Sequence, residues 1–221
     1  MIREAYESAA GLFVNTVAQV EPTQWEQPGL GVWTVRDLVG HTSRALLTVE
    51  LYLAKPAARR EIVRPVDYLL RAQAGLADPA SVAARGREAG VALGSDPIAA
   101  VRDIAARVLA QVQAASDEVL VSTPVGGMRL IDYLPSRIFE LAVHTLDIAA
   151  ALPVTVTLPE PVAAVALHLL ADMALQPDKA AALLLAATGR RALPAGPRSA
   201  HKPACPSPPR IAALPRPSPR A

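Results

Sequence analysis

Apolar residues recur every three or four positions along most of the chain, which is the spacing of one face of an α-helix. Prolines and capping residues divide this pattern into segments, as at Pro22 and at Thr34, where Asp37 follows three residues later. Residues 121–128 contain a proline and two glycines and predict a loop or a short hairpin. The remaining pattern predicts helices over residues 2–20, 35–54, 65–77, 80–92, 97–118, 134–152, 159–175 and 177–189.

The order of these segments favours an all-α fold. Alanine and leucine dominate the sequence and aromatic residues make up 4% of it, a balance that also favours helices over strands. Antiparallel helices joined by short loops pack as bundles, so we predict a four-helix bundle with extra C-terminal helices. The longer connection over residues 21–33 should be anchored to the bundle by Trp25, Leu30 and Trp33.

One predicted helix carries polar residues on a single stripe. Arg137, Glu140, His144 and Asp147 fall within about 80° of each other around the helix axis, and nearly all other positions from 138 to 148 are apolar. We therefore expect this helix to be buried on most sides. A buried carboxylate and imidazole without partners would cost several kcal/mol, and a metal cation would satisfy both groups.

A second helix supplies a third candidate ligand. Apolar and small residues from Leu38 to Tyr52 follow a three–four spacing, and His41 lies on the same inward stripe. Glu140 and His144, four residues apart, could bind one ion together with His41, leaving a coordination position open for water, a thiol or a substrate. The spacing alone is equally compatible with a buried Arg–Glu–His–Asp network that holds no metal.

Cysteine content and the N-terminus narrow the class of protein. The single cysteine, Cys205, excludes an intramolecular disulfide and a cysteine-rich zinc site, so a metal would need histidine and carboxylate ligands. Charges at Arg3, Glu4 and Glu7 interrupt the apolar run that a signal peptide requires. Apolar stretches elsewhere are shorter than the roughly 20 residues of a membrane span. We expect a cytoplasmic protein without a membrane partner.

The C-terminal residues 194–221 differ in composition from the rest of the chain. They contain nine prolines and five basic residues but no acidic residue, which leaves 17 basic and 20 acidic residues elsewhere. We predict a disordered tail and no nucleic-acid partner, although basic residues of this kind can contact nucleic acids. The expected division is a metal-binding bundle over residues 1–155, C-terminal helices packed on it over 156–193, and the tail.

Three segments of the sequence resemble one protein family. They are GVWTVRDLVGHTSR at residues 31–44, RIFELAVHTLD at 137–147 and LLLAATGRRALP at 183–194. Together they are similar to the mycothiol-dependent maleylpyruvate isomerase family, whose N-terminal domain is a DinB/YfiT-like four-helix bundle. The resemblance implies a divalent metal, most commonly zinc, bound by His41, Glu140 and His144, and a low-molecular-weight thiol such as mycothiol as cofactor.

The family also has a further C-terminal domain that contributes to catalysis. Here two short helices and the proline-rich tail occupy that part of the sequence, so the resemblance implies the bundle, the metal and the thiol more directly than maleylpyruvate isomerisation. Zinc deprotonates a bound thiol at neutral pH. The resulting thiolate would add to an electrophilic carbon without any protein cysteine, which suits an isomerase or a thiol transferase acting on a small electrophile.

Two further residues are candidates for catalysis. We expect Asp147 to orient a ligand histidine, and Arg137 to pair with an acidic residue or to meet an anionic group of the substrate. We expect neither His168 nor His201 to be a metal ligand. The alternative functions are a non-catalytic metal-binding or ligand-binding bundle with a stress or sensing role and, after it, a metal-dependent hydrolase. The alanine-rich helix faces also allow a homodimer.

Overall fold

The computed structural model describes residues 1–76, 78–175 and 179–193. Its secondary structure consists of helices and one two-stranded antiparallel hairpin. The helices are α1 (Ile2–Val17), α2 (Val35–Leu53), α3 (Pro65–Leu76), α4 (Pro79–Ala92), α5 (Pro97–Ala114), α6 (Leu130–Ala151), α7 (Glu160–Ala174) and α8 (Lys179–Ala187). The strands are β1 (Leu120–Thr123) and β2 (Gly126–Arg129).

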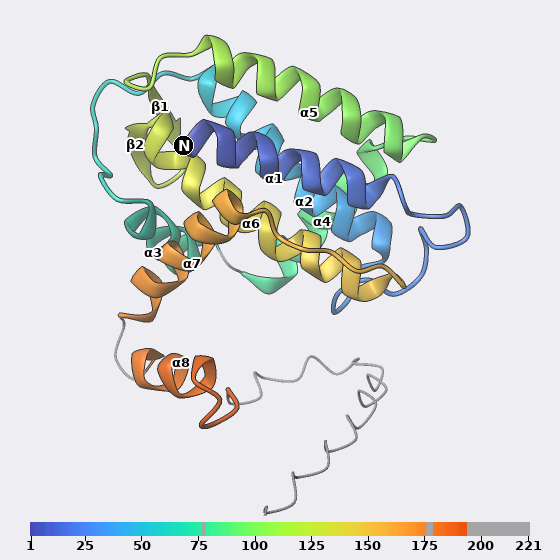
Figure 1. Ribbon diagram of the computed structural model, residues 1–221. Coiled ribbons are helices and arrows are strands. Elements are labelled where there is room, and N and C mark those ends of the chain that lie inside the picture. The colour runs from blue at the N-terminus through green and yellow to red at the C-terminus, as the bar shows by residue number, and fades with distance from the viewer. Residues whose placement is uncertain (77, 176–178, 194–221) are drawn as a thin grey trace, which may run out of the picture.

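Four long helices form the bundle. α1 and α2 each pack against both α5 and α6, so the four surround one apolar core (Figure 1). Its largest fully buried side chains include Tyr6, Phe13, Leu38, Leu46 and Leu141. α4 packs against α2, α7 lies across α6 and α1, and α8 contacts α7. The predicted all-α four-helix bundle with extra C-terminal helices is confirmed.

The start of α2 is fixed by its capping residues. The side chain of Thr34 accepts a hydrogen bond from the backbone N–H of Asp37, and the Asp37 carboxylate accepts one from the backbone N–H of Thr34. This capping box is the arrangement that the sequence predicts. It sets the phase of α2, and with it the direction in which His41 points.

Two predicted helix ends were wrong. α6 begins at Leu130 and not near Leu134, because it continues directly from the hairpin and tolerates Pro135 in its second turn at the loss of one backbone hydrogen bond. α5 ends at Ala114 and not near residue 118. The guanidinium group of Arg3, on α1, donates hydrogen bonds to carbonyl oxygens at this end of α5, which satisfies groups that a longer helix would have used.

Two predictions of burial were also wrong. Leu30 is 40% exposed, whereas Trp25 and Trp33 are buried and anchor the 21–33 connection. Val143 and Leu146 are exposed on α6, because none of the described helices covers that side of its C-terminal half. α6 is thus buried on fewer sides than its sequence suggested.

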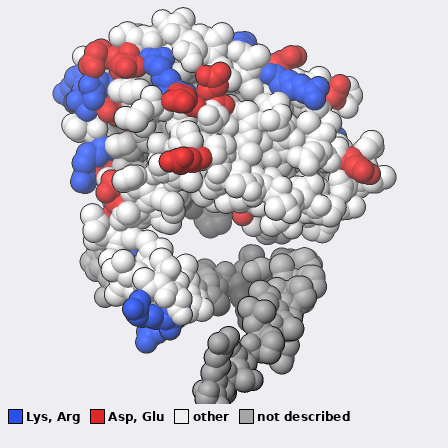
Figure 2. Space-filling model, in the orientation of Figure 1, with Lys and Arg blue, Asp and Glu red and all other residues white. Residues whose placement is uncertain are grey.

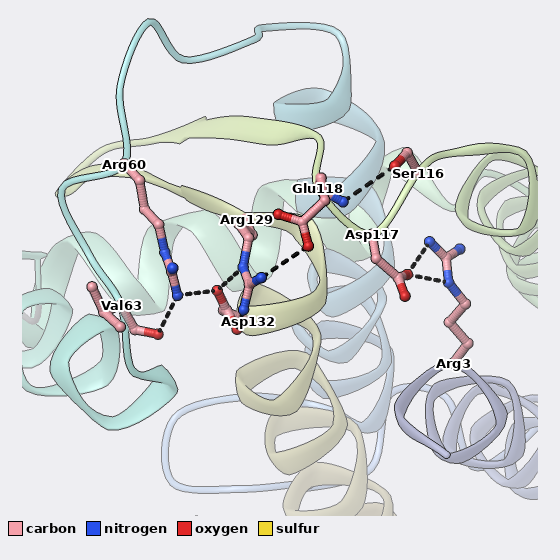
Figure 3. Close-up of polar contacts among 8 residues, drawn as sticks. All are labelled: Arg3, Arg60, Val63, Ser116, Asp117, Glu118, Arg129 and Asp132. Carbon is pink, nitrogen blue, oxygen red and sulfur yellow. Dashed lines mark hydrogen bonds and ion pairs between the residues drawn. The ribbon is translucent and has the colours of Figure 1, made fainter.

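The predicted turn over residues 121–128 is a hairpin, and charged residues join it to the bundle. Asp132, in the first turn of α6, accepts hydrogen bonds from Arg129 at the end of β2 and from Arg60 in the preceding loop, each at 2.8 Å (Figure 3). The N–H of Glu61 donates to the carbonyl oxygen of Gly127 at 2.7 Å. These contacts hold the loop and hairpin against α6, where Pro124 borders the cavity described below.

Charges of both signs are interspersed on the face of the molecule shown in Figure 2. Within the described residues, none of the helices combines the length and apolar character needed to cross a membrane. The predicted tail 194–221, with His201 and Cys205, lies outside the described residues, and the domain boundaries at 155 and 193 stay predictions.

Candidate metal centre

Three side chains from two facing helices meet at one end of an internal cavity. His41 comes from α2, and Glu140 and His144 come from successive turns of α6. Each offers one potential ligand atom, and these atoms lie within 4.8 Å of one another. The two imidazole rings are perpendicular, with centroids 4.8 Å apart. The structure therefore brings together the three residues that the sequence proposed as ligands.

The His41 ring is held in place by an aromatic neighbour. Trp33 lies against it with a centroid distance of 4.4 Å, and the indole N–H of Trp33 donates to the carbonyl oxygen of Ala83 on α4 at 3.1 Å. A Cβ on Gly86 would come within 2.6 Å of the Trp33 ring. α4 thus positions the histidine through the tryptophan, a role that sequence reasoning missed because nothing in the local pattern relates Gly86 to Trp33.

His144 is oriented by carboxylates on both sides of its ring. Its Nδ1 lies 3.0 Å from Oδ2 of Asp147, and its Nε2 lies 3.3 Å from Oε2 of Glu140. An imidazole whose second nitrogen bonds a carboxylate is the usual arrangement of a metal-ligating histidine. Asp147 therefore occupies the place of an orienting group.

The electrostatics of the two histidines differ. Burial lowers the pKa of His41 to about 4, and the neighbouring His144 lowers it further against a weaker effect of Glu140. Burial would also lower the pKa of His144, but its hydrogen bonds with Asp147 and Glu140 outweigh burial and raise it to about 9. Without an ion, one imidazole is neutral at pH 7 and the other carries a proton.

Glu140 is ionised. Burial would raise the pKa of its carboxyl group, but the hydrogen bond with His144 and the positive charge of Arg137 outweigh burial and lower it to about 2. A charged carboxylate next to two imidazoles is a donor set that suits a divalent cation.

One atom of the site fits an ion directly. Nδ1 of His41 is buried and has no hydrogen-bond partner in the described part of the chain. A buried polar atom without a partner is unfavourable, and such groups in native proteins call for an explanation. Together with the convergence of three donors, this atom indicates that the residues present fit a bound divalent metal.

The cavity beside these residues has a volume of about 270 Å³. This is just below the roughly 300–1,000 Å³ of typical ligand pockets, so it suits a small molecule. Its walls come from α2, α3, α4, α6 and the hairpin turn. The lining residues are His41, Thr42, Arg44, Ala45, Thr48, Tyr52, Tyr68, Arg85, Pro124, Arg137, Glu140 and His144.

Arg137 also lines this cavity, but it does not form the ion pair that the sequence favoured. No carboxylate lies within 4 Å of its guanidinium group among the described residues, and Glu140 acts on it from a longer distance. Its Nε donates to Oγ of Ser136 at 3.1 Å. His168 is exposed and its Nδ1 lies 2.7 Å from the carbonyl oxygen of Ala164, away from the candidate ligands.

A four-helix bundle that presents a histidine from one helix and a Glu–His pair from a facing helix defines a class of small helical proteins with a site suited to a metal. Comparison with protein families makes this more specific. The model of the mycothiol maleylpyruvate isomerase N-terminal domain matches residues 6–149. This match covers more than half of the sequence, so the chain belongs to that family. Neither the curated proteins nor the solved structures contain a significant match.

Proposed function

We propose that this protein binds a divalent metal, zinc in the first place, and is a mycothiol-dependent isomerase or thiol transferase acting on a small electrophile. The observation that carries the proposal is the meeting of three metal-type donors, within 4.8 Å of one another, at the wall of a cavity of about 270 Å³. Membership of a family named for mycothiol supports the choice of thiol. When bound, the metal would supply a thiol in its thiolate form at neutral pH.

The chain's own residues have separate roles in this proposal. His41, Glu140 and His144 hold the ion, and Asp147 orients His144 through its Nδ1. Trp33 fixes the His41 ring by packing against it. The small cavity admits the electrophile, whereas a thiol as large as mycothiol would extend beyond the mouth of the cavity.

Metal analysis of the purified protein tests the site first. We expect about one equivalent of divalent metal per chain, lost in both His41→Ala and Glu140→Ala because each removes a ligand. The matched control is His168→Ala, which removes an exposed histidine outside the site and should keep the metal. A protein that stays metal-free after incubation with zinc, nickel and manganese would contradict the proposal.

Thiol binding separates an enzyme from a binding protein. Mycothiol titrated into the metal-loaded protein should bind in the millimolar range or tighter, and it should be consumed or should catalyse isomerisation when electrophiles with activated double bonds are supplied.

A second candidate function is a non-catalytic metal-binding bundle. It is favoured by the Glu140–His144 and His144–Asp147 contacts, which satisfy His144 without any ligand. Metal binding without thiol binding at millimolar concentration would support this candidate and reject the enzyme.

A further inference from the structure

The cavity has a second polar wall, opposite in character to the candidate ligands. Arg137 lies against the faces of two tyrosines, with its Cζ 4.9 Å from the ring centroid of Tyr133 and 5.5 Å from that of Tyr68. Tyr52 packs against Tyr133 at 5.5 Å, and Tyr68 packs against Tyr133 at 5.1 Å. Residues from α2, α3 and α6 thus surround one guanidinium group.

This guanidinium group has unused hydrogen-bonding capacity. Arg137 is 9% exposed, and its five N–H groups make one hydrogen bond within the described residues, from Nε to Ser136. A buried cation without a counter-ion is unfavourable. Since Arg137 lines the cavity, a ligand in the cavity can reach the remaining N–H groups.

Two tyrosine hydroxyl groups are also without partners. The hydroxyl of Tyr133 donates to Oγ1 of Thr48 at 3.0 Å, and that of Tyr6 donates to the carbonyl oxygen of Ala45 at 3.4 Å. Tyr52 and Tyr68 line the cavity, and neither hydroxyl has a hydrogen-bond partner among the described residues. They add neutral donors beside the cation.

The charge of the cavity favours an anion. Three arginines line it, Arg44, Arg85 and Arg137, against one carboxylate, that of Glu140. A bound divalent metal would add further positive charge. A small cavity lined in this way attracts and retains negatively charged ligands.

The geometry points to the kind of anion. Because aromatic rings cover the faces of the Arg137 guanidinium group, a ligand must approach along its planar edge, where paired N–H groups match the two oxygens of a carboxylate. We propose that Arg137, Tyr52 and Tyr68 form a subsite for a carboxylate group of the electrophile. This inference deepens the proposed function: Arg137 anchors the substrate while its reactive carbon faces the metal centre.

Pyruvate tests the subsite, with its neutral methyl ester as the comparison, in calorimetric titrations of both metal-free and zinc-loaded protein. We expect pyruvate to bind in both states and the ester to bind at least 10-fold more weakly. Tyr68→Phe should weaken pyruvate binding by about 3- to 10-fold through the loss of one hydrogen bond. Tyr6→Phe is the matched control, because it removes a buried tyrosine hydroxyl remote from the cavity and should leave affinity unchanged.

Arg137→Met should abolish pyruvate binding, and circular dichroism will show whether this variant folds; if it does not, Tyr68→Phe and the ester comparison decide. Equal affinity for pyruvate and its ester, tighter binding of inorganic phosphate, or binding that needs zinc and ignores Tyr68→Phe would each overturn the subsite. The last result would leave the metal site intact. Conversely, pyruvate binding by a protein that never takes up metal would reject the proposed function and keep the subsite.

Discussion

The two histidines of the candidate metal centre have opposite protonation states because their neighbours differ. His41 has an indole ring beside it, whereas His144 lies between two carboxylates. Metal binding requires both imidazoles to be neutral, so the ion must displace the proton that His144 carries in the free protein.

Proton release on zinc binding should therefore be measurable at pH 6. His144, with a pKa of about 9, is protonated there, while His41 with a pKa of about 4 is neutral and Glu140 with a pKa of about 2 is ionised. We expect about one proton to be released per ion, and the apparent affinity to rise as pH increases towards 9. Calorimetry in buffers of different ionisation enthalpy measures the number. Release of two protons or none would contradict these states.

Asp147 gives a second prediction at this scale. Asp147→Asn removes the charge that orients His144, and we expect zinc affinity to fall by about 10- to 100-fold, measured by competition with a chromophoric chelator. Asp117→Asn is the matched control, because Asp117 pairs with Arg3 in a surface contact remote from the site (Figure 3). Equal affinities of the two variants would remove the orienting role of Asp147.

At the level of whole elements, α4 determines the geometry of the site although it provides none of the candidate ligands. It approaches α2 closely, since a Cβ on Gly40 would lie 2.2 Å from the backbone nitrogen of Gly90. Gly86 on the same helix leaves room for Trp33, which packs on His41. The position of an imidazole on α2 thus depends on small residues of another helix.

Gly86→Ala should disturb the site without touching a ligand. The added methyl group must displace the Trp33 ring, and with it His41, so we expect zinc affinity to fall by at least 10-fold and the protein to lose about 1–3 kcal/mol of stability through overpacking. Chelator competition and urea unfolding measure the two effects. Gly11→Ala is the control, because nothing lies within 4 Å of its added Cβ in the middle of α1, and it should be neutral or stabilising by about 0.5–1 kcal/mol. Unchanged zinc affinity in Gly86→Ala would contradict the role of Trp33.

For the molecule as a whole, the metal would connect two helices of the bundle that are distant in sequence. An ion held by α2 and α6 binds the folded state and not the unfolded chain, so metal binding adds to the free energy of unfolding. The core around Leu38, Leu46 and Leu141 is fully buried without the ion. The bundle should therefore fold without metal and gain stability from it.

Zinc should raise the melting temperature in proportion to occupancy. With free zinc at 100 times the dissociation constant, the gain is about 2.7 kcal/mol, or roughly 5–10 °C for a chain of this size. Differential scanning calorimetry should show this shift in the unaltered protein and in His168→Ala, but not in His41→Ala. A shift that persists in His41→Ala would place the ion elsewhere.

Local patterns in the sequence were sufficient for the elements and for the direction of single side chains. The three–four spacing placed His41 on an inward stripe, and the i, i+4 spacing placed Glu140 and His144 on one face, because helix geometry depends on neighbours within a few residues. The capping box at Thr34 was predictable for the same reason. The start of α6 was not, because the hairpin contacts that support its first turn lie outside any local window.

The sequence by itself determined that this chain folds as helices with buried polar stripes, since periodicity is a property of consecutive residues. Only the tertiary structure decided that the two stripes face each other, that Trp33 covers His41, and that three tyrosines surround Arg137 and leave it without a counter-ion. Those relations join residues up to about a hundred positions apart, and they depend on how side chains of different helices fill space together. The candidate ligands could be read from the sequence, whereas the cavity and its unpaired cation are properties of the packed bundle.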